Sequence, residues 1–277
     1  MKNYRFHLTG AFGDPIDENP TCVMMNAAYE AAGVNFRYLN FLVKQGSLKD
    51  ALNGIRAMHF DGVNLTMPHK VEALQYVDEL SPSVALIGST NTIVNQGGRL
   101  VAHNTDGQGF VEGMRRSGVS LAGKELVLLG AGGAARAIAA ECALAGAAHI
   151  FILNRNASRG QSVAAMVNEK TACAAEYLPW TPGVAIPPCQ ILINATCVGM
   201  GSGQVPDIDY DSIRPGTIVQ DIVPQHTAFL EKAKSMGLPA HDGFSMLVYQ
   251  GAIAFQLWTG VAADTDVMFR ALSAEAD

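Results

Sequence analysis

The chain has 277 residues, 49% of them hydrophobic and 16% charged, with a formal net charge of -6. This length and apolar content fit an α/β enzyme of one large domain or two smaller ones and exclude a disordered chain. The acidic balance argues against nucleic acid or an anionic membrane surface as a partner, because both attract clustered Lys and Arg.

Alternating apolar residues, separated by stretches of helical periodicity, predict βαβ units in the first part of the chain. The expected strands lie near Tyr4–Leu8, Phe36–Val43, Gly62–Thr66 and Thr92–Asn95, and the expected helices include Thr21–Ala32 and Leu48–Met58. Such units form a mostly parallel sheet, and polar residues at its strand ends are candidates for a ligand site.

A second βαβ series follows a connecting helix expected at Gly107–Ser117. Its expected elements are strand Glu125–Leu129, helix Gly133–Ala145, strands Ile150–Leu153, Ile191–Ile193 and Thr217–Val219, helix Ala228–Met236, and apolar helical segments after Asp242. The two series predict two domains, residues 1–105 completed by 242–277, and residues 106–241.

The uncharged stretch 243–263 contains Ser245, Gln250 and Gln256, which is more typical of a buried helix facing a polar site than of a membrane span. Five scattered cysteines without a C-x-x-C pair indicate neither a disulfide framework nor a zinc site. The histidines also lack ligand spacing, so no metal is expected. A reducing, cytoplasmic environment is the natural interpretation.

The strongest single motif is a glycine-rich turn, G-x-G-x-x-A, between an apolar strand and an Ala-rich helix. In a dinucleotide site the first glycine allows the tight turn, the second lets the backbone approach the pyrophosphate, and the third small residue lets helix and strand pack closely. The residues expected to bind the cofactor here are Gly130, Ala131, Gly132, Gly133 and Ala134.

The next strand ends in Asn154, Arg155 and Asn156, with Arg159 shortly after. NAD sites usually place an acidic residue here to bind the ribose 2′-OH, whereas arginine accommodates the 2′-phosphate of NADP. The absence of the acid and the two arginines favour NADP. If Arg155 instead stacks on adenine and Arg159 is a solvated helix residue, NAD fits as well.

Other polar residues stand at expected strand ends of the first domain. Lys70 begins a helix, where the helix dipole disfavours a cation, and this unusual position marks it as a candidate acid/base group. Asp106 opens the connecting helix and is either an N-cap or a second candidate. Asn91 is either a turn residue or a ligand-binding amide.

Taken in order, these motifs resemble the shikimate/quinate dehydrogenase family over nearly the whole chain. The matching segments are Gly13–Ile16, Asn64–Lys70, Asn91–Thr92, Asn104–Gly107, Gly130–Arg136, Asn154–Arg155, Asn194–Thr196, Gly199–Met200 and Asp242–Met246 with Gln250. The resemblance implies an α/β fold with an N-terminal substrate domain, completed by the C-terminal helices, and a Rossmann-like NAD(P)-binding domain.

The family resemblance further implies hydride transfer between NAD(P) and a cyclic polyol carboxylic acid, shikimate or quinate, as in aromatic amino acid biosynthesis. Lys70 and Asp106 would handle the proton of the reacting hydroxyl. The substrate-binding residues implied are Asn19, Thr21, Thr66, Asn91 and Gln250. Those implied near the cofactor, beyond the glycine turn and the arginines, are Thr196, Ile222, Gly243 and Met246.

Two departures from the family pattern concern the substrate. The family usually has two serines that bind the substrate carboxylate, and this chain has Asn19 and Thr21 there, next to the acidic Asp17 and Glu18. A substrate-contacting tyrosine of the family is also missing after Asp221. The altered positions leave open a dehydrogenase for an amino-substituted or other shikimate analogue, or a non-catalytic nucleotide-dependent binding protein. A homodimer is also expected.

Overall fold

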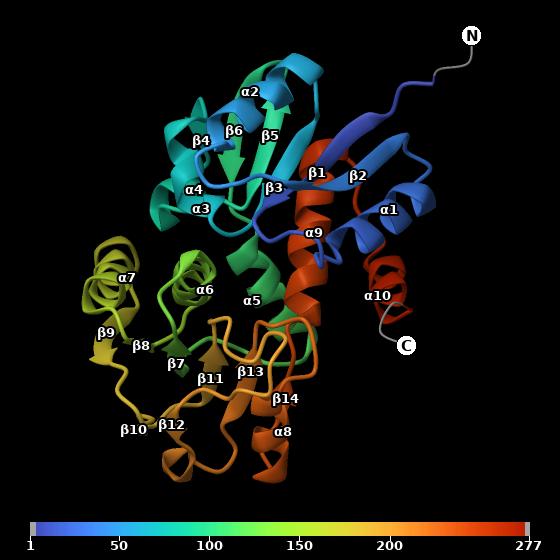
Figure 1. Cartoon of the computed structure of the whole chain (residues 1–277). Helices are drawn as coiled ribbons and strands as arrows, with labels where there is room; N and C mark the ends of the chain where they lie inside the picture. Colours follow the sequence, from blue (N-terminus) through green and yellow to red (C-terminus); the bar gives the residue numbers. More distant parts are fainter. Residues whose placement is uncertain (1–3, 275–277) are drawn as a thin grey trace. The chain divides into compact units, whose positions relative to one another are not determined.

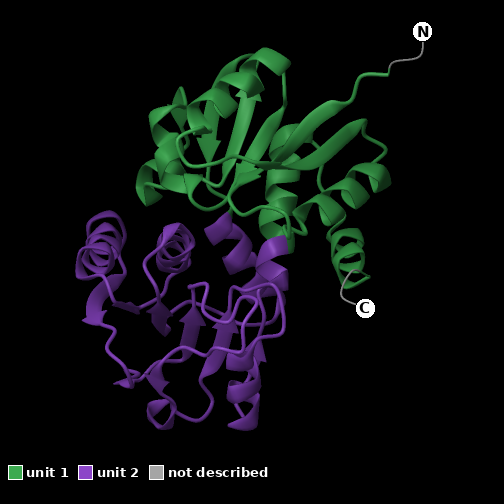
Figure 2. Cartoon of the chain, viewed as in Figure 1, with its two compact units in different colours: residues 1–105, 248–277 green, residues 106–247 purple. Residues whose placement is uncertain are grey.

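A computed structural model describes residues 4–274, which form two compact units (Figures 1 and 2). Unit 1 comprises residues 1–105 and 248–277, and unit 2 comprises residues 106–247. The sequence placed the second boundary at 242, in the turn just before helix α9, whereas the division into units falls inside that helix. The predicted α/β class is confirmed, since both units are built on parallel strands flanked by helices.

Unit 1 contains a six-stranded sheet in the order β2-β1-β3-β5-β6-β4. Strands β1, β2 and β3 are parallel, whereas β5 is antiparallel to both β3 and β6. The strands are β1 His7–Gly13, β2 Phe36–Leu42, β3 Gly62–Leu65, β4 Glu79–Leu80, β5 Thr92–Gln96 and β6 Arg99–His103. The helices are α1 Thr21–Ala31, α2 Leu48–Met58, α3 His69–Glu72, a 3-10 turn Ala73–Gln75, α4 Pro82–Ile87, the second part of α9 Phe244–Thr259, and α10 Thr265–Ser273.

Helices cover both faces of the unit 1 sheet (Figure 1). On one face, α2 buries Leu48, Leu52 and Ile55, which recur at helical spacing, against the side chains of β1, β3, β5 and β6. On the other face, Tyr29 of α1 stacks on Phe255 of α9 with 5.0 Å between ring centroids. The C-terminal helices therefore belong to the core of unit 1.

Unit 2 contains a six-stranded parallel sheet in the order β14-β13-β11-β7-β8-β9. If these six strands are numbered 1 to 6 along the chain, from β7 to β14, their order in the sheet starting at β9 is 3-2-1-4-5-6. This is the doubly wound order, and its switch point lies between β7 and β11. The strands are β7 Glu125–Leu129, β8 His149–Asn154, β9 Ala174–Pro179, β11 Ile191–Asn194, β13 Ile218–Asp221 and β14 Ala240–His241, with a separate pair β10 Val184–Ala185 and β12 Ile208–Asp209. The helices are α5 Asp106–Arg116, α6 Gly133–Leu144, α7 Ala157–Lys170, a 3-10 turn Tyr210–Ser212, α8 Ala228–Ser235 and the start of α9.

The core of unit 2 comes from near-continuous apolar strands, as a sheet buried on both faces requires. Helices α6 and α7 pack on β7, β8 and β9, and α8 packs on β13 and β14. Among residues 4–274, no helix is both long enough and apolar enough to cross a membrane.

Some expected elements were wrong in detail. The first strand was expected at Tyr4–Leu8 but is His7–Gly13, because its ladder with β2 runs from the pair His7 and Phe36 to the pair Gly13 and Leu42. Tyr4 and Phe6, whose alternation suggested the earlier start, are exposed. The other expected strands and helices agree with the structure to within one or two residues at each end.

Candidate active site

The polar residues singled out in unit 1 gather at one edge of its sheet. The loops after β1, β2 and β3 leave the carboxyl ends of parallel strands. Because β5 runs antiparallel to β3, and β6 antiparallel to β5, the residues before β5 and after β6 reach the same edge. Open α/β sheets bind their ligands at this edge.

The loops after β1 and β3 are in direct contact there. The Asp14 amide donates to the Met67 carbonyl at 3.0 Å, and a Cβ atom at Gly13 would lie 2.3 Å from Cγ2 of Thr66. Only glycine therefore allows this approach. The hydroxyl of Thr66, half-buried, makes no hydrogen bond within residues 4–274 and can serve a ligand.

Asn91 and Gln250, far apart in sequence, belong to one buried cluster with Thr105. Nδ2 of Asn91 donates to the Thr105 hydroxyl at 2.9 Å and to Oε1 of Gln250 at 3.3 Å, and its Oδ1 accepts from the Thr105 amide at 2.7 Å. All three residues are buried. The cluster joins the end of β6 and helix α9 to the start of β5.

Sequence reasoning missed a second layer of polar residues beneath this cluster. Asn64 of β3 accepts from the Tyr38 hydroxyl at 2.8 Å and donates to the Thr92 hydroxyl at 3.0 Å. Thr105 belongs to the same network through Thr92. An asparagine inside a four-residue strand that is otherwise apolar was the available signal, because such a side chain needs buried partners.

The backbone of Lys70 is fixed on both sides. The buried imidazole of the preceding His69 lies 2.7 Å from the Val43 carbonyl at the end of β2, and the Thr90 amide donates to the Lys70 carbonyl at 2.8 Å. Helix α3 is a single turn, so the helix dipole invoked from the sequence is small. The stronger reason to consider Lys70 as an acid/base group is its position at the sheet edge that also carries Asn91.

Asp106 directly follows Thr105 and is the first residue of α5 and of unit 2. Its carboxylate is buried. Within residues 4–274, no group of three or more His, Cys, Asp or Glu side chains is arranged to hold a metal ion.

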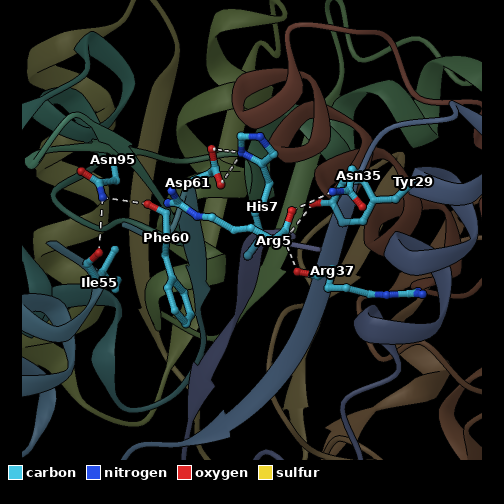
Figure 3. A network of polar contacts seen from close by, with 10 residues as sticks. Arg5, His7, Tyr29, Asn35, Arg37, Ile55, Phe60, Asp61 and Asn95 are labelled. Atoms are coloured by element: carbon cyan, nitrogen blue, oxygen red, sulfur yellow. Dashed lines mark hydrogen bonds and ion pairs between the residues drawn. The ribbon is translucent and has the colours of Figure 1, made fainter. Parts of the chain in front are cut away.

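A separate polar network lies at the opposite, amino-terminal edge of the unit 1 sheet (Figure 3). Nδ1 of His7 lies 3.0 Å from the Asp61 carboxylate, and Nδ2 of Asn35 donates to the Arg5 carbonyl at 2.8 Å. These contacts join strand ends to one another. We therefore regard this network as structural.

In unit 2 the glycine turn lies at the switch point of the sheet. Gly130 has a φ of +110°, and a Cβ atom there would lie 2.8 Å from Cγ2 of Thr196, in the loop after β11. A Cβ atom at Gly132 would instead meet nothing within 4 Å. Gly132 precedes the twelve-residue helix α6 without a side-chain cap, so helix amides stay available to an anion. This open backbone cradle fits a dinucleotide pyrophosphate.

The residues after β8 lie at the carboxyl end of the strand next to β7, which leads into the glycine turn. Oδ1 of Asn156 caps helix α7 by accepting from the Arg159 amide at 3.0 Å, and Nδ2 of Asn154 donates to the Asn156 carbonyl at 2.8 Å. Arg155 and Arg159 are exposed. Two cations beside a helix N-terminus suit a phosphate group.

A buried aspartate organises the loop that faces the glycine turn. Asp221, at the end of β13, accepts from Nδ2 of Asn194 and the Val223 amide, each at 3.1 Å, and from the Thr227 hydroxyl at 2.8 Å. Oδ1 of Asn194 in turn accepts from the Thr196 hydroxyl at 2.7 Å. Thr196 is thus held in place through Asn194 and Asp221.

The remaining residues expected near the cofactor also lie at the carboxyl edge of this sheet. Ile222 follows β13, and a Cβ atom at Gly243 would lie 2.1 Å from the Ile222 carbonyl oxygen. Met246, in the first turn of α9, is buried. Glycine is therefore required where these two segments meet.

Replacing Asp221 with asparagine is expected to lower the free energy of unfolding by about 2–3 kcal/mol, because the new amide group would face donors where a carboxylate now accepts. Burial raises the pKa of Asp221 above 3.8, and hydrogen bonds from Val223, Thr227 and Asn194 oppose the shift. A raised native pKa contributes stability at low pH that is lost as pH rises from 3.8 through the native value. The Asp221→Asn variant should lack this pH dependence of stability, because an amide side chain does not titrate.

Denaturant unfolding between about pH 3 and 8 measures both effects. The matched control is Asp211→Asn, an exposed aspartate of the same unit whose substitution should change stability by no more than about 0.5 kcal/mol. Equal stability and equal pH dependence of Asp221→Asn and wild type would contradict the role assigned to Asp221.

Together, a doubly wound unit with a phosphate cradle and a unit with amides, hydroxyls and a lysine at one sheet edge define a dinucleotide-dependent oxidoreductase. Matches to models of known protein families support the same class of protein. Residues 11–93 match the shikimate dehydrogenase substrate binding domain, residues 113–197 match shikimate / quinate 5-dehydrogenase, and residues 243–272 match the shikimate 5'-dehydrogenase C-terminal domain. The chain belongs to the shikimate/quinate dehydrogenase family, and it is an NAD(P)-dependent oxidoreductase.

Individual relatives span nearly the whole chain. A shikimate dehydrogenase (NADP(+)) of Desulforamulus reducens is 39% identical over 96% of this chain and 94% of its own. The crystal structure of 5-ketofructose reductase of a Gluconobacter strain is 43% identical, with a TM-score of 0.91 over 99% of this chain and all of that one. Shikimate 5-dehydrogenase of Thermus thermophilus, in complex with NADP(H) and shikimate, is 32% identical, with a TM-score of 0.86 over 96% and 98% of the two chains.

Proposed function

We propose that this oxidoreductase transfers a hydride between NADP(H) and a secondary alcohol of a polyhydroxylated substrate, with shikimate and 3-dehydroshikimate as the first candidate pair. The observation that carries the proposal is the buried Asn91, Thr105 and Gln250 cluster at the sheet edge that also holds Lys70. Amides and hydroxyls both donate and accept, as substrate hydroxyls do. The relatives named as NADP-dependent shikimate dehydrogenases support the same reaction and do not favour a non-catalytic protein or an amino-substituted substrate.

In unit 1, Thr66, Asn91 and Gln250 would orient the substrate ring, and Asn19 and Thr21 would bind its far end. Loss of a hydride from an alcohol carbon requires that the hydroxyl also lose its proton. Nζ of Lys70 would accept that proton in the oxidation and return it in the reduction, with Asp106 as its carboxylate partner.

In unit 2, the Gly130 turn would hold the pyrophosphate, and Arg155 and Arg159 would bind the 2′-phosphate. Thr196, Ile222, Gly243 and Met246 would line the nicotinamide end. NADPH supplies the hydride when it is bound. A cytoplasmic location and a homodimer belong to the same proposal.

The cofactor preference gives a direct prediction. The double variant Arg155→Ala/Arg159→Ala should raise KM for NADPH by about tenfold to a hundredfold, because charge-assisted hydrogen bonds to the 2′-phosphate are lost. KM for NADH should stay the same. Lys170→Ala, at the other end of α7, is the matched control and should leave both values unchanged. Equal losses toward NADPH and NADH would contradict the assignment.

Reduction of 5-ketofructose is the second candidate reaction. It is favoured by the 43% identity with the reductase named for that substrate and by the replacement of the two serines with Asn19 and Thr21. The diketone is uncharged, whereas 3-dehydroshikimate carries a carboxylate.

Both reactions can be tested by following NADPH oxidation with each ketone. Turnover of at least one is expected. If NADPH binds and neither ketone is reduced, the proposed function is contradicted.

A further inference from the structure

The loop that contains Asn19 and Thr21 is fixed beside the end of strand β2. Nδ2 of Asn40, on β2, donates to the Asn19 carbonyl at 2.9 Å, and the Asn19 amide donates to the Ile16 carbonyl at 3.1 Å. Ile16 is buried and anchors the turn. The side chains of Asn19 and Thr21 are thus held at the carboxyl edge where the polar cluster lies.

Hydrogen bonds within the pair determine what it can offer a ligand. The Thr21 hydroxyl donates to Oδ1 of Asn19 at 2.7 Å, and the Thr21 amide donates to the same oxygen at 3.1 Å. The hydroxyl proton and the amide oxygen are therefore both used inside the loop. Within residues 4–274, Nδ2 of Asn19 has no acceptor and Oγ1 of Thr21, in a residue that is 5% exposed, has no donor, so the pair can offer a ligand one donor and one acceptor.

One donor next to one acceptor matches a hydroxyl group, which accepts and donates at once. A carboxylate only accepts, so it would have to draw the Thr21 proton away from Asn19. Two serine hydroxyls, the usual family pair, offer two protons without this competition.

The charge of the loop also favours an uncharged hydroxyl group over a carboxylate. Residues 14–22 include three exposed carboxylates, Asp14, Asp17 and Glu18, and no Lys or Arg. Their field disfavours an anion at this loop, whereas Lys44 and Lys70 follow the carboxyl ends of β2 and β3, and an uncharged hydroxyl group is affected little by either sign of charge.

We infer that Asn19 and Thr21 bind an uncharged hydroxyl group of the substrate and determine its end-group specificity, so that of the two candidate substrates this enzyme favours the uncharged polyhydroxylated ketone. This inference rests on the proposed function, because it concerns the substrate site of the same hydride transfer. It adds the residues that distinguish the two candidate substrates.

The test compares kcat/KM for 5-ketofructose and for 3-dehydroshikimate, with NADPH, in the wild type and in Asn19→Ser/Thr21→Ser. The wild type is expected to reduce 5-ketofructose with a kcat/KM at least equal to that for 3-dehydroshikimate. The double variant should shift the ratio toward the carboxylate substrate by about tenfold to a hundredfold, as expected when polar partners of a substrate group are exchanged. Asn35→Ser, at the opposite edge of the sheet, is the matched control and should leave the ratio unchanged.

A second variant, Thr21→Val, removes the hydroxyl while keeping the branched shape. It should lower kcat/KM for 5-ketofructose about tenfold, because a substrate hydroxyl loses its acceptor, and lower the value for 3-dehydroshikimate by less, because a carboxylate can still accept from Nδ2 of Asn19. Wild-type turnover of 3-dehydroshikimate without turnover of 5-ketofructose, or an unchanged ratio in both variants, would overturn the inference and leave the proposed function standing. Failure of the wild type with both ketones would instead contradict the proposed function.

Discussion

Replacement of Lys70 with methionine is expected to lower kcat by about 10²–10⁴-fold, the usual contribution of a positioned general acid or base. Methionine preserves the length of the side chain but cannot exchange a proton with the substrate oxygen. The backbone hydrogen bond from Thr90 to Lys70 does not involve the side chain, so the fold should be kept. KM for NADPH, whose proposed site is in unit 2, should change little.

Steady-state kinetics and thermal unfolding measure these effects together. Lys44→Met provides the matched control, since this exposed lysine follows the end of β2 at the same edge of the sheet. The control should retain wild-type kcat. A Lys70→Met enzyme with kcat within about threefold of the wild type would remove Lys70 from the proton transfer.

Replacing Gly130 with alanine should mainly lower stability, whereas replacing Gly132 with alanine should mainly weaken NADPH binding. Gly130→Ala places a side chain at a φ of +110° and within 2.8 Å of Thr196, so backbone strain of about 1–3 kcal/mol adds to a steric clash. Gly132→Ala meets no neighbouring atom, so it should cost no more than about 1 kcal/mol, the usual difference between these residues before a helix. Its methyl group would nevertheless occupy the space proposed for the pyrophosphate.

Thermal unfolding and NADPH titration distinguish the two variants. Gly130→Ala should unfold at a lower temperature than the wild type. Gly132→Ala should lower the unfolding temperature by no more than about 4 °C and lose NADPH affinity by about tenfold or more, since backbone amides can no longer approach the phosphates. Unchanged NADPH affinity in Gly132→Ala would contradict the placement of the cofactor at this turn.

Much of the fold was predictable because its signals are local. The strand Glu125–Leu129 was predicted with its observed bounds, since a buried parallel strand is an apolar run and the glycine turn marks its end. Edge elements were missed for the opposite reason. Strand β9, Ala174–Pro179, lies at the edge of its sheet and is only half-buried, so it has little hydrophobic pattern.

One missed strand did carry a usable signal. Gly97 and Gly98 both have positive φ and connect the antiparallel strands β5 and β6. A Gly-Gly pair between two apolar runs is typical of a two-residue hairpin turn. It would have predicted Arg99–His103.

The candidate site was only partly predictable. Lys70 follows a parallel strand of unit 1 and Asn154 ends one of unit 2, and chain order alone brings such residues to the carboxyl edge of each sheet. Asn91 reaches the edge of Lys70 only because β5 is antiparallel to β3, which the sequence did not reveal. Hydrogen-bond partners are set by tertiary packing, so the contact between Asn91 and Gln250 and the internal bond between Thr21 and Asn19 did not follow from the sequence. Because of that internal bond, the pair can offer a ligand one donor and one acceptor.

The most direct test of the central claim is the transfer of deuterium from NADPH that carries deuterium at both C4 positions of the nicotinamide, so that either face can deliver the label. After incubation with 3-dehydroshikimate and, separately, with 5-ketofructose, mass spectrometry and NMR locate the label in the product. The proposed function predicts one deuterium on the newly formed carbinol carbon of at least one product, and about 10²–10⁴-fold slower formation of that labelled product with Lys70→Met. Complete retention of the label in the nucleotide with both ketones, despite NADPH binding, would contradict it.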